Sequence, residues 1–168
     1  MDERISELLG MVRDEVEACE GILAQERRKT LALARRRAEE LLECAKSGEE
    51  RLARLHGLES GRSRLCGELG RELRIPEGEL TLARLAESLA VRGADAETVR
   101  ELRATAAALG DAVRRMGLAS ARNRRLMERM RQHADGMLAV LAGASGAYQP
   151  NGMFEAAVAV PPTFSQNA

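Results

Sequence analysis

Aromatic side chains are almost absent from this sequence. Its 168 residues contain no tryptophan, one tyrosine and two phenylalanines, and these three, Tyr148, Phe154 and Phe164, all lie near the C-terminus. Because aromatic residues usually supply the large anchors of cores and interfaces, the body must build its core from Leu, Ala, Val and Met. This distribution indicates a helical scaffold whose C-terminal end carries the aromatic residues for contacts with a partner, which favours a binding protein over an enzyme.

Paired cysteines, a leader and a membrane span are also missing. Cys19, Cys44 and Cys66 form no C-x-x-C pair, and an odd number of cysteines predicts free thiols in a reducing compartment. The charged N-terminus lacks a secretory signal. The longest uncharged stretch, residues 136–154, is interrupted by glycine and proline and is a poor membrane span. We therefore expect a soluble cytoplasmic protein without membrane insertion.

The sequence has no excess of charge that would favour nucleic-acid binding and no motif typical of catalysis. The 26 basic residues balance the 26 acidic ones. The arginines of residues 114–131 could contact nucleic acid, but without stacking aromatics we expect a solvated or internally paired face and no nucleic-acid partner. His56 and His133 are isolated, so no metal site is predicted. Without a phosphate-binding glycine loop or a catalytic triad order, we expect neither enzymatic activity nor a cofactor.

Apolar spacing predicts a long first helix. Residues 5–23 carry apolar side chains at steps of three and four, which is the seam of a coiled coil or bundle helix. That register fails at Glu26 and Thr30, and a second apolar series replaces it one residue further on. We expect one helix over about residues 2–70, with a bend or fraying in the glycine-rich segment 57–70.

Two further helices are predicted after a turn. The sequence Ile75-Pro76-Glu77-Gly78 marks the turn, and a short helix over about 80–92 follows, with Thr81 as a possible N-cap. A third helix is expected over about 95–142, with Asp95 as its N-cap. Its seam is an unbroken three-four alternation: Val99, Leu102, Ala106, Leu109, Val113, Met116, Ser120, Asn123, Met127, Met130, Ala134, Met137 and Leu141.

Charge favours an antiparallel pairing of the first and third helices. Residues 1–20 carry seven acidic side chains, and residues 114–131 carry seven arginines, so folding one helix back on the other brings opposite charges together. The predicted fold is all-α: an elongated antiparallel helical hairpin or coiled-coil bundle of two long helices with a short middle helix. Residues 1–142 form this helical body, and residues 143–168 form a flexible C-terminal tail.

Polar and methionine residues of the third seam allow two interpretations each. Asn123 and Ser120 either fix the register as a polar layer, which precedent favours, or contact a partner helix. Met127, Met130 and Met137 could be ordinary core residues. Because these methionines cluster beside the tail that carries the aromatic residues, they favour a seam that accepts another helix.

The chain resembles the FlgN family of flagellar export chaperones. Three elements carry the resemblance: a leucine-rich run that closes on Leu58-Glu59-x-x-Arg62, the step Asn123-x-x-Leu126, and the element Tyr148-Gln149-Pro150-Asn151-Gly152 after the heptad helix. The order of long helix, short helix, long helix and tail also agrees, so the resemblance covers most of the chain.

The resemblance implies a cytoplasmic chaperone that binds the C-terminal helical region of the hook–filament junction proteins FlgK and FlgL. It also implies delivery to the flagellar type III export gate, where Tyr148 could dock on the component FlhA. The alternative is a structural coiled-coil or adaptor protein that only self-associates, and the free chain could form a homodimer. The expected partner-binding residues are Asn123, Met127, Met130, Met137, Leu141, Tyr148, Gly152, Met153 and Phe154.

Overall fold

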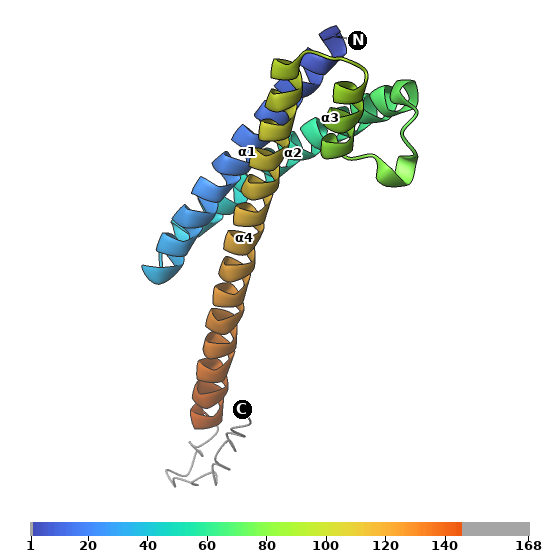
Figure 1. Cartoon of the computed structure of the whole chain (residues 1–168). Coiled ribbons are helices and arrows are strands. Elements are labelled where there is room, and N and C mark those ends of the chain that lie inside the picture. Colours follow the sequence, from blue (N-terminus) through green and yellow to red (C-terminus); the bar gives the residue numbers. More distant parts are fainter. Residues whose placement is uncertain (1, 146–168) are drawn as a thin grey trace, which may run out of the picture. The chain divides into compact units, whose positions relative to one another are not determined.

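The computed structural model describes residues 2–145, and these residues form helices without any strand, which confirms the all-α class (Figure 1). By its internal contacts the chain divides into two units, residues 1–124 and 125–168. The helices are α1 (Asp2–Ala34), α2 (Ala38–Leu73), the short 3-10 helix η1 (Glu77–Glu79), α3 (Leu82–Val91) and α4 (Ala96–Ser145).

The expectation of one helix over residues 2–70 was wrong, because the chain reverses between α1 and α2. Arg36 adopts a left-handed conformation with φ 54°. The Arg37 N–H donates to the Ala32 carbonyl at 3.0 Å and the Arg36 N–H to the Leu33 carbonyl at 3.2 Å. These bonds form a helix-ending motif that usually has glycine at its left-handed position. Because arginine stands there, no glycine marks the turn in the sequence.

Of the bend or fraying expected for segment 57–70, fraying was wrong, since α2 is helical throughout that segment. Packing outweighs the low helix propensity of glycine there, because Leu65, Leu69 and Leu73 are buried in the core. Gly70 lies at one close approach: a Cβ at this position would lie 2.7 Å from Leu80 Cδ1, so the Leu80 side chain would have to shift. The segment after α2 therefore packs directly onto the helix.

The predicted start signals of the later helices are confirmed. The Thr81 hydroxyl accepts from the Arg84 N–H at 3.1 Å, and the Asp95 carboxylate accepts from the Thr98 N–H at 3.0 Å. These side chains satisfy N–H groups that the first turn of a helix leaves free. The α3 helix then closes at Gly93, whose φ of 78° suits glycine.

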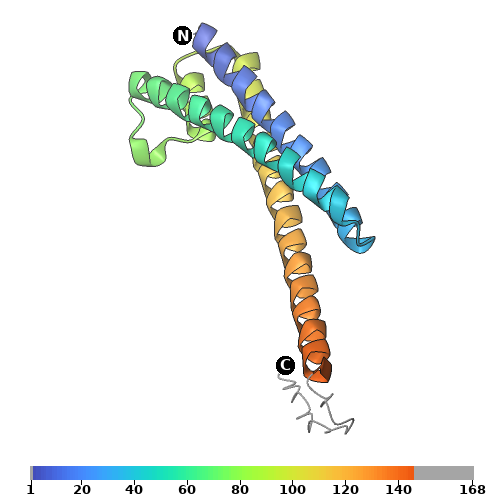
Figure 2. The same cartoon turned by 180° about the vertical axis from the view of Figure 1, so that it is seen from behind.

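The antiparallel hairpin consists of α1 and α2, not of the first and last helices. In the first unit α4 runs parallel to α1, because pairs along α1 match increasing positions along α4: Arg13 with Glu101, and Glu20 with Arg115 (Figures 1 and 2). The predicted antiparallel pairing was therefore wrong. Because the chain reverses between α1 and α2, which was not predicted, α4 runs in the same direction as α1 instead of the opposite one.

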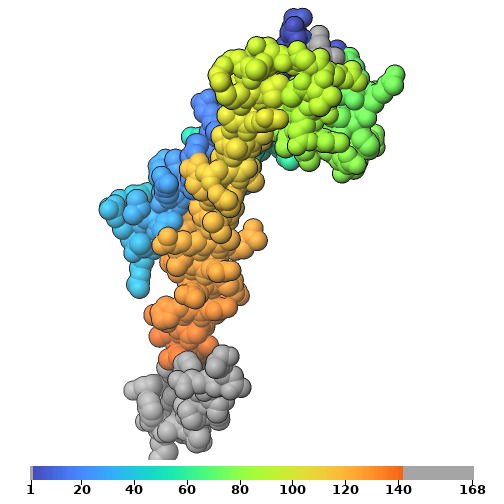
Figure 3. All heavy atoms as spheres, viewed as in Figure 1, coloured from blue at the N-terminus to red at the C-terminus, as the bar shows by residue number. Residues whose placement is uncertain are grey.

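One hydrophobic core joins α1, α2, α3 and the first part of α4. It includes Leu8 and Val12 of α1, Leu69 of α2, Leu85 of α3 and Leu102 of α4, each almost completely buried. The space-filling view shows these helices packed closely over one another within the first unit (Figure 3). Leucine, isoleucine, valine, alanine and cysteine form this core without aromatic residues, and the partly buried Met11 and Met116 pack against it.

An ion pair lies inside the α1–α2 hairpin. Glu15 is only 2% exposed, and the Arg62 Nε donates to its two carboxylate oxygens at 2.8 and 2.9 Å. Burial raises the pKa of Glu15, while the Arg62 guanidinium acts in the opposite direction. The arginine of the Leu-Glu-x-x-Arg element therefore neutralises a buried acid.

Candidate partner-binding face

The α4 seam is covered in the first unit as far as Asn123. Val99, Leu102 and Leu109 are buried, and Met116 is partly buried against the same core. Val113 is an exception, since it is exposed while its neighbour Ala112 is buried. The buried face therefore rotates slightly from the heptad line, as a straight α-helix does.

Asn123 is almost completely buried, and its amide contacts α1. Its Nδ2 donates to the Glu26 carbonyl at 2.6 Å and to the Glu26 carboxylate at 2.7 Å. The Thr30 hydroxyl lies 2.8 Å from its Oδ1. The two α1 positions at which the sequence register failed thus meet the polar position of the α4 seam. This contact is the one that the register interpretation of Asn123 predicts.

Replacing Asn123 by alanine should lower the free energy of unfolding by about 1–3 kcal/mol, because Oε2 of the buried Glu26 carboxylate loses the Asn123 amide as its donor. Urea unfolding followed by circular dichroism measures this loss. Ser120→Ala is the matched control, since Ser120 is a partly buried seam residue without a side-chain hydrogen bond within residues 2–145; it should change stability by less than about 0.5 kcal/mol. Equal stability of Asn123→Ala and the wild type would contradict the register role.

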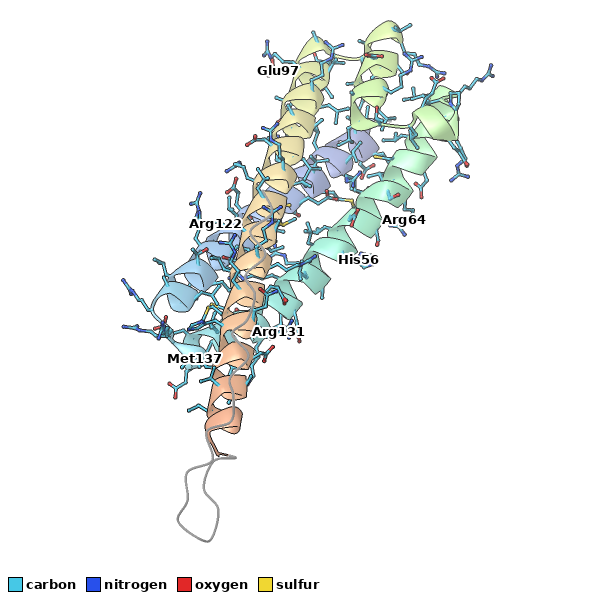
Figure 4. All side chains as sticks on the ribbon, turned by 90° about the horizontal axis from the view of Figure 1, so that it is seen from below. His56, Arg64, Glu97, Arg122, Arg131 and Met137 are labelled. Atoms are coloured by element: carbon cyan, nitrogen blue, oxygen red, sulfur yellow. The ribbon has the colours of Figure 1, made fainter. Side chains whose placement is uncertain are left out.

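Beyond Asn123 the same seam is exposed on the second unit. Met127 is 43%, Met130 40% and Met137 55% exposed, and Leu141 is exposed as well. Ala134, between them, is also exposed. Figure 4 labels Met137 on the last part of α4, with Arg131 earlier on the same helix. Four of the expected partner-binding residues therefore form one apolar face of a single helix.

Two further apolar residues widen this face, and the sequence analysis did not include them. Leu138 and Val140 are exposed beside Met137. The heptad pattern could have identified them, because Leu138 directly follows the seam residue Met137 and Val140 directly precedes the seam residue Leu141. Next to them lies a shallow hollow of about 430 Å³, lined by Gln132, His133, Gly136, Met137, Val140 and Leu141.

The arginine block of residues 114–131 is partly paired inside the chain. Arg115 contacts Glu20 at 2.5 Å and Asp111 at 2.6 Å. In the second unit Arg131 binds Glu128 at 2.8 Å and Asp135 at 2.9 Å. The hydrogen bond from Arg131 lowers the pKa of Glu128. These pairs support the expectation of a solvated, internally paired surface.

The remaining expected site residues, Tyr148, Gly152, Met153 and Phe154, lie outside the described residues. Over residues 2–145, no helix combines the length and the hydropathy that crossing a bilayer requires. The same residues contain no cluster of His, Cys, Asp or Glu side chains that could hold a metal ion. All three cysteines are free and buried.

Fold and surface thus define an all-α protein with an exposed apolar helix face. The chain matches the family model described as FlgN protein over residues 1–155. It therefore belongs to the FlgN family, the flagellar export chaperones. Neither a curated protein nor a solved structure matched the chain.

Proposed function

We propose that this chaperone binds the C-terminal helical region of the junction proteins FlgK and FlgL in the cytoplasm and delivers them to the export gate. The observation that carries the proposal is the continuity of the α4 seam. Its three-four alternation is covered as far as Asn123 and continues as the exposed residues Met127, Met130 and Met137. Such a stripe suits an amphipathic helix, which lays its apolar side into a partner's groove.

Methionine suits a surface that has to accept more than one partner. Its unbranched side chain adapts to irregular neighbours, and adaptable surfaces of this kind occur in proteins that bind several targets. FlgK and FlgL would offer two such targets. The tail element from Tyr148 to Phe154 would add aromatic anchors beside the helix face, and Tyr148 would contact either the substrate or FlhA.

Size-exclusion chromatography of the chain, alone and with purified FlgK, tests the proposal. We expect a one-to-one complex. Deletion of residues 146–168 removes none of the described helices, which lie within residues 2–145, and should weaken the complex; circular dichroism checks that the helices remain. If the shortened chain binds as tightly as the full one, the tail is not a binding element.

Self-association through the same seam is the rival function. It predicts a stable homodimer at low concentration, no complex with FlgK, and no effect of Tyr148→Ala. The apolar face alone fits both functions, and family membership favours the chaperone. Chromatography of the free chain at several concentrations separates the two.

A further inference from the structure

The turn between α1 and α2 forms a basic tip, residues 27–37. This segment contains six basic side chains and no acidic one. Figures 1 and 2 show the turn at the free end of the α1–α2 hairpin. Five of the six basic side chains are exposed: Arg27, Arg28, Arg35, Arg36 and Arg37.

Most of the charge of the basic tip has no partner in the chain. Lys29 pairs with Glu26 at 2.8 Å, and Arg37 pairs with Glu40 at 2.5 Å. The side chains of the other four arginines make no hydrogen bond or ion pair within residues 2–145. These four guanidinium groups are therefore available to an external anionic surface.

The acidic residues that follow do not cancel this charge. Glu39, Glu40 and Glu43 lie in the first turns of α2, so residues 27–43 contain six basic and three acidic side chains, a net charge of +3. Clusters of about four to eight basic residues on a helix are typical of contacts with anionic lipid headgroups.

An exposed leucine lies among the arginines of α1. Leu31 is 54% exposed. With about 100° between successive residues of a helix, Leu31 lies about 40° from Arg27, and Arg28 about 100° in the same direction. A basic helix face that includes an apolar residue suits a membrane interface. The basic tip lacks the aromatic side chains that stack on nucleic-acid bases.

The shape of the basic tip favours a bilayer over an acidic protein segment. Its arginines come from one face of α1 and from the reversing turn after it, so they extend from a protruding end. A folded acidic partner would need a concave site that matches this end. The headgroup layer of a bilayer is deformable and presents many phosphates, so it can meet all of these arginines at once.

We propose that the basic tip docks this chain on the surface of an anionic phospholipid bilayer. The arginines contact lipid phosphates, and Leu31 lies at the depth of the headgroups. The contact is peripheral, and residues 2–145 contain no helix that could span the bilayer. It uses the first unit only, so it does not depend on the binding of FlgK.

Co-sedimentation of the full chain with vesicles tests this inference. We expect binding to vesicles of phosphatidylcholine with about 30% phosphatidylglycerol, weakened by salt, and no binding to phosphatidylcholine alone. The variant Arg27→Gln/Arg28→Gln/Arg35→Gln should lower the affinity by at least about 30-fold, since each basic residue near the surface contributes about fivefold. Lysine at the same three positions should keep it within about threefold, because lipid phosphates accept either cation.

A matched control removes the same charge from α4. Arg122, Arg124 and Arg125 are exposed, and their side chains make no ion pair within residues 2–145. Replacing these three by glutamine should change the affinity for anionic vesicles by less than about threefold. Equal losses in both glutamine variants, or loss of binding in the lysine variant, would overturn the inference. Binding to poly-glutamate or duplex DNA but not to anionic vesicles would also overturn it.

Arg36 gives a readout that unfolding cannot mimic. Its φ of 54° suits glycine better than arginine, so Arg36→Gly should raise the melting temperature by about 2–4 °C. The same variant should lower the affinity for anionic vesicles about fivefold. Arg74→Gly is the control at the second left-handed arginine, φ 57°; it should raise the melting temperature similarly and leave vesicle binding unchanged. Unchanged vesicle binding of Arg36→Gly would contradict docking through the turn.

Discussion

Replacing Arg62 by methionine is expected to lower the free energy of unfolding by about 3 kcal/mol at neutral pH, the lower end of the range for breaking a buried ion pair. Methionine keeps much of the aliphatic volume but leaves the Glu15 carboxylate without its cation. That carboxylate is almost inaccessible to water. Since domains are stable by only about 5–15 kcal/mol, a loss of this size should be visible in a single urea titration.

The loss should depend on pH. Burial already raises the folded-state pKa of Glu15, and the Arg62 guanidinium opposes this rise, so the variant should raise that pKa further. Between the unfolded and the folded pKa the folded variant binds a proton that the unfolded chain releases. Its stability should therefore increase as the pH falls toward the unfolded pKa of Glu15. The deficit relative to the wild type should shrink in the same direction.

Urea titrations at pH 7.5 and at about pH 5 measure this change. The double variant Glu15→Leu/Arg62→Met is the control, because replacing both partners of a buried pair by apolar residues is often neutral or stabilising. It should recover most of the lost stability. It should also lack the pH dependence that Glu15 causes in the single variant. A deficit that is the same at both pH values would show that Glu15 does not carry the cost.

The second large effect concerns binding. Met130→Glu combined with Met137→Glu should weaken the FlgK complex at least 100-fold, about 2.7 kcal/mol, because two carboxylates would have to lose their water at an apolar contact. Both side chains are exposed in the free chain, so its helical content and its melting temperature should hardly change. Isothermal titration calorimetry and circular dichroism measure the two quantities.

A matched control adds the same two charges elsewhere. Val91 and Leu118 are 89% and 68% exposed, and neither lies on the predicted seam of α4. The variant Val91→Glu/Leu118→Glu should bind FlgK within about threefold of the wild type, which is below 1 kcal/mol. Equal losses in both double variants would point to net charge rather than to the methionine face.

Much of the local structure could be predicted because its signals lie close together in the chain. Thr81 and Asp95 cap helices that begin one residue later, and a cap needs only a side-chain oxygen within reach of the first turn. The seam of α4 was equally clear, since its period of three and four is a property of one helix. The prediction of free thiols is also confirmed for all three cysteines.

The errors arose where a local signal was missing or where distant partners compete. The reversal at Arg36 has neither glycine nor proline, so only hydrogen bonds at the end of α1 reveal it. Several arginine-containing segments could pair with the acidic residues near the N-terminus. Glu15 pairs with α2 and Glu20 with α4. Charge totals cannot select among such partners, because every arrangement that brings opposite signs together gains similar energy.

By itself the sequence determined the all-α class, the caps, the unbroken α4 seam and the place of the aromatics, since each depends on residues within a few turns of one another. Only the tertiary structure decided that α1 and α2 form the hairpin and that α4 runs parallel to α1. It also decided that Glu26 and Thr30 of α1 meet Asn123 of α4, while Met127 and Met137 are exposed. One repeat thus yields a covered half and an exposed half, because burial depends on which helices pack beside it.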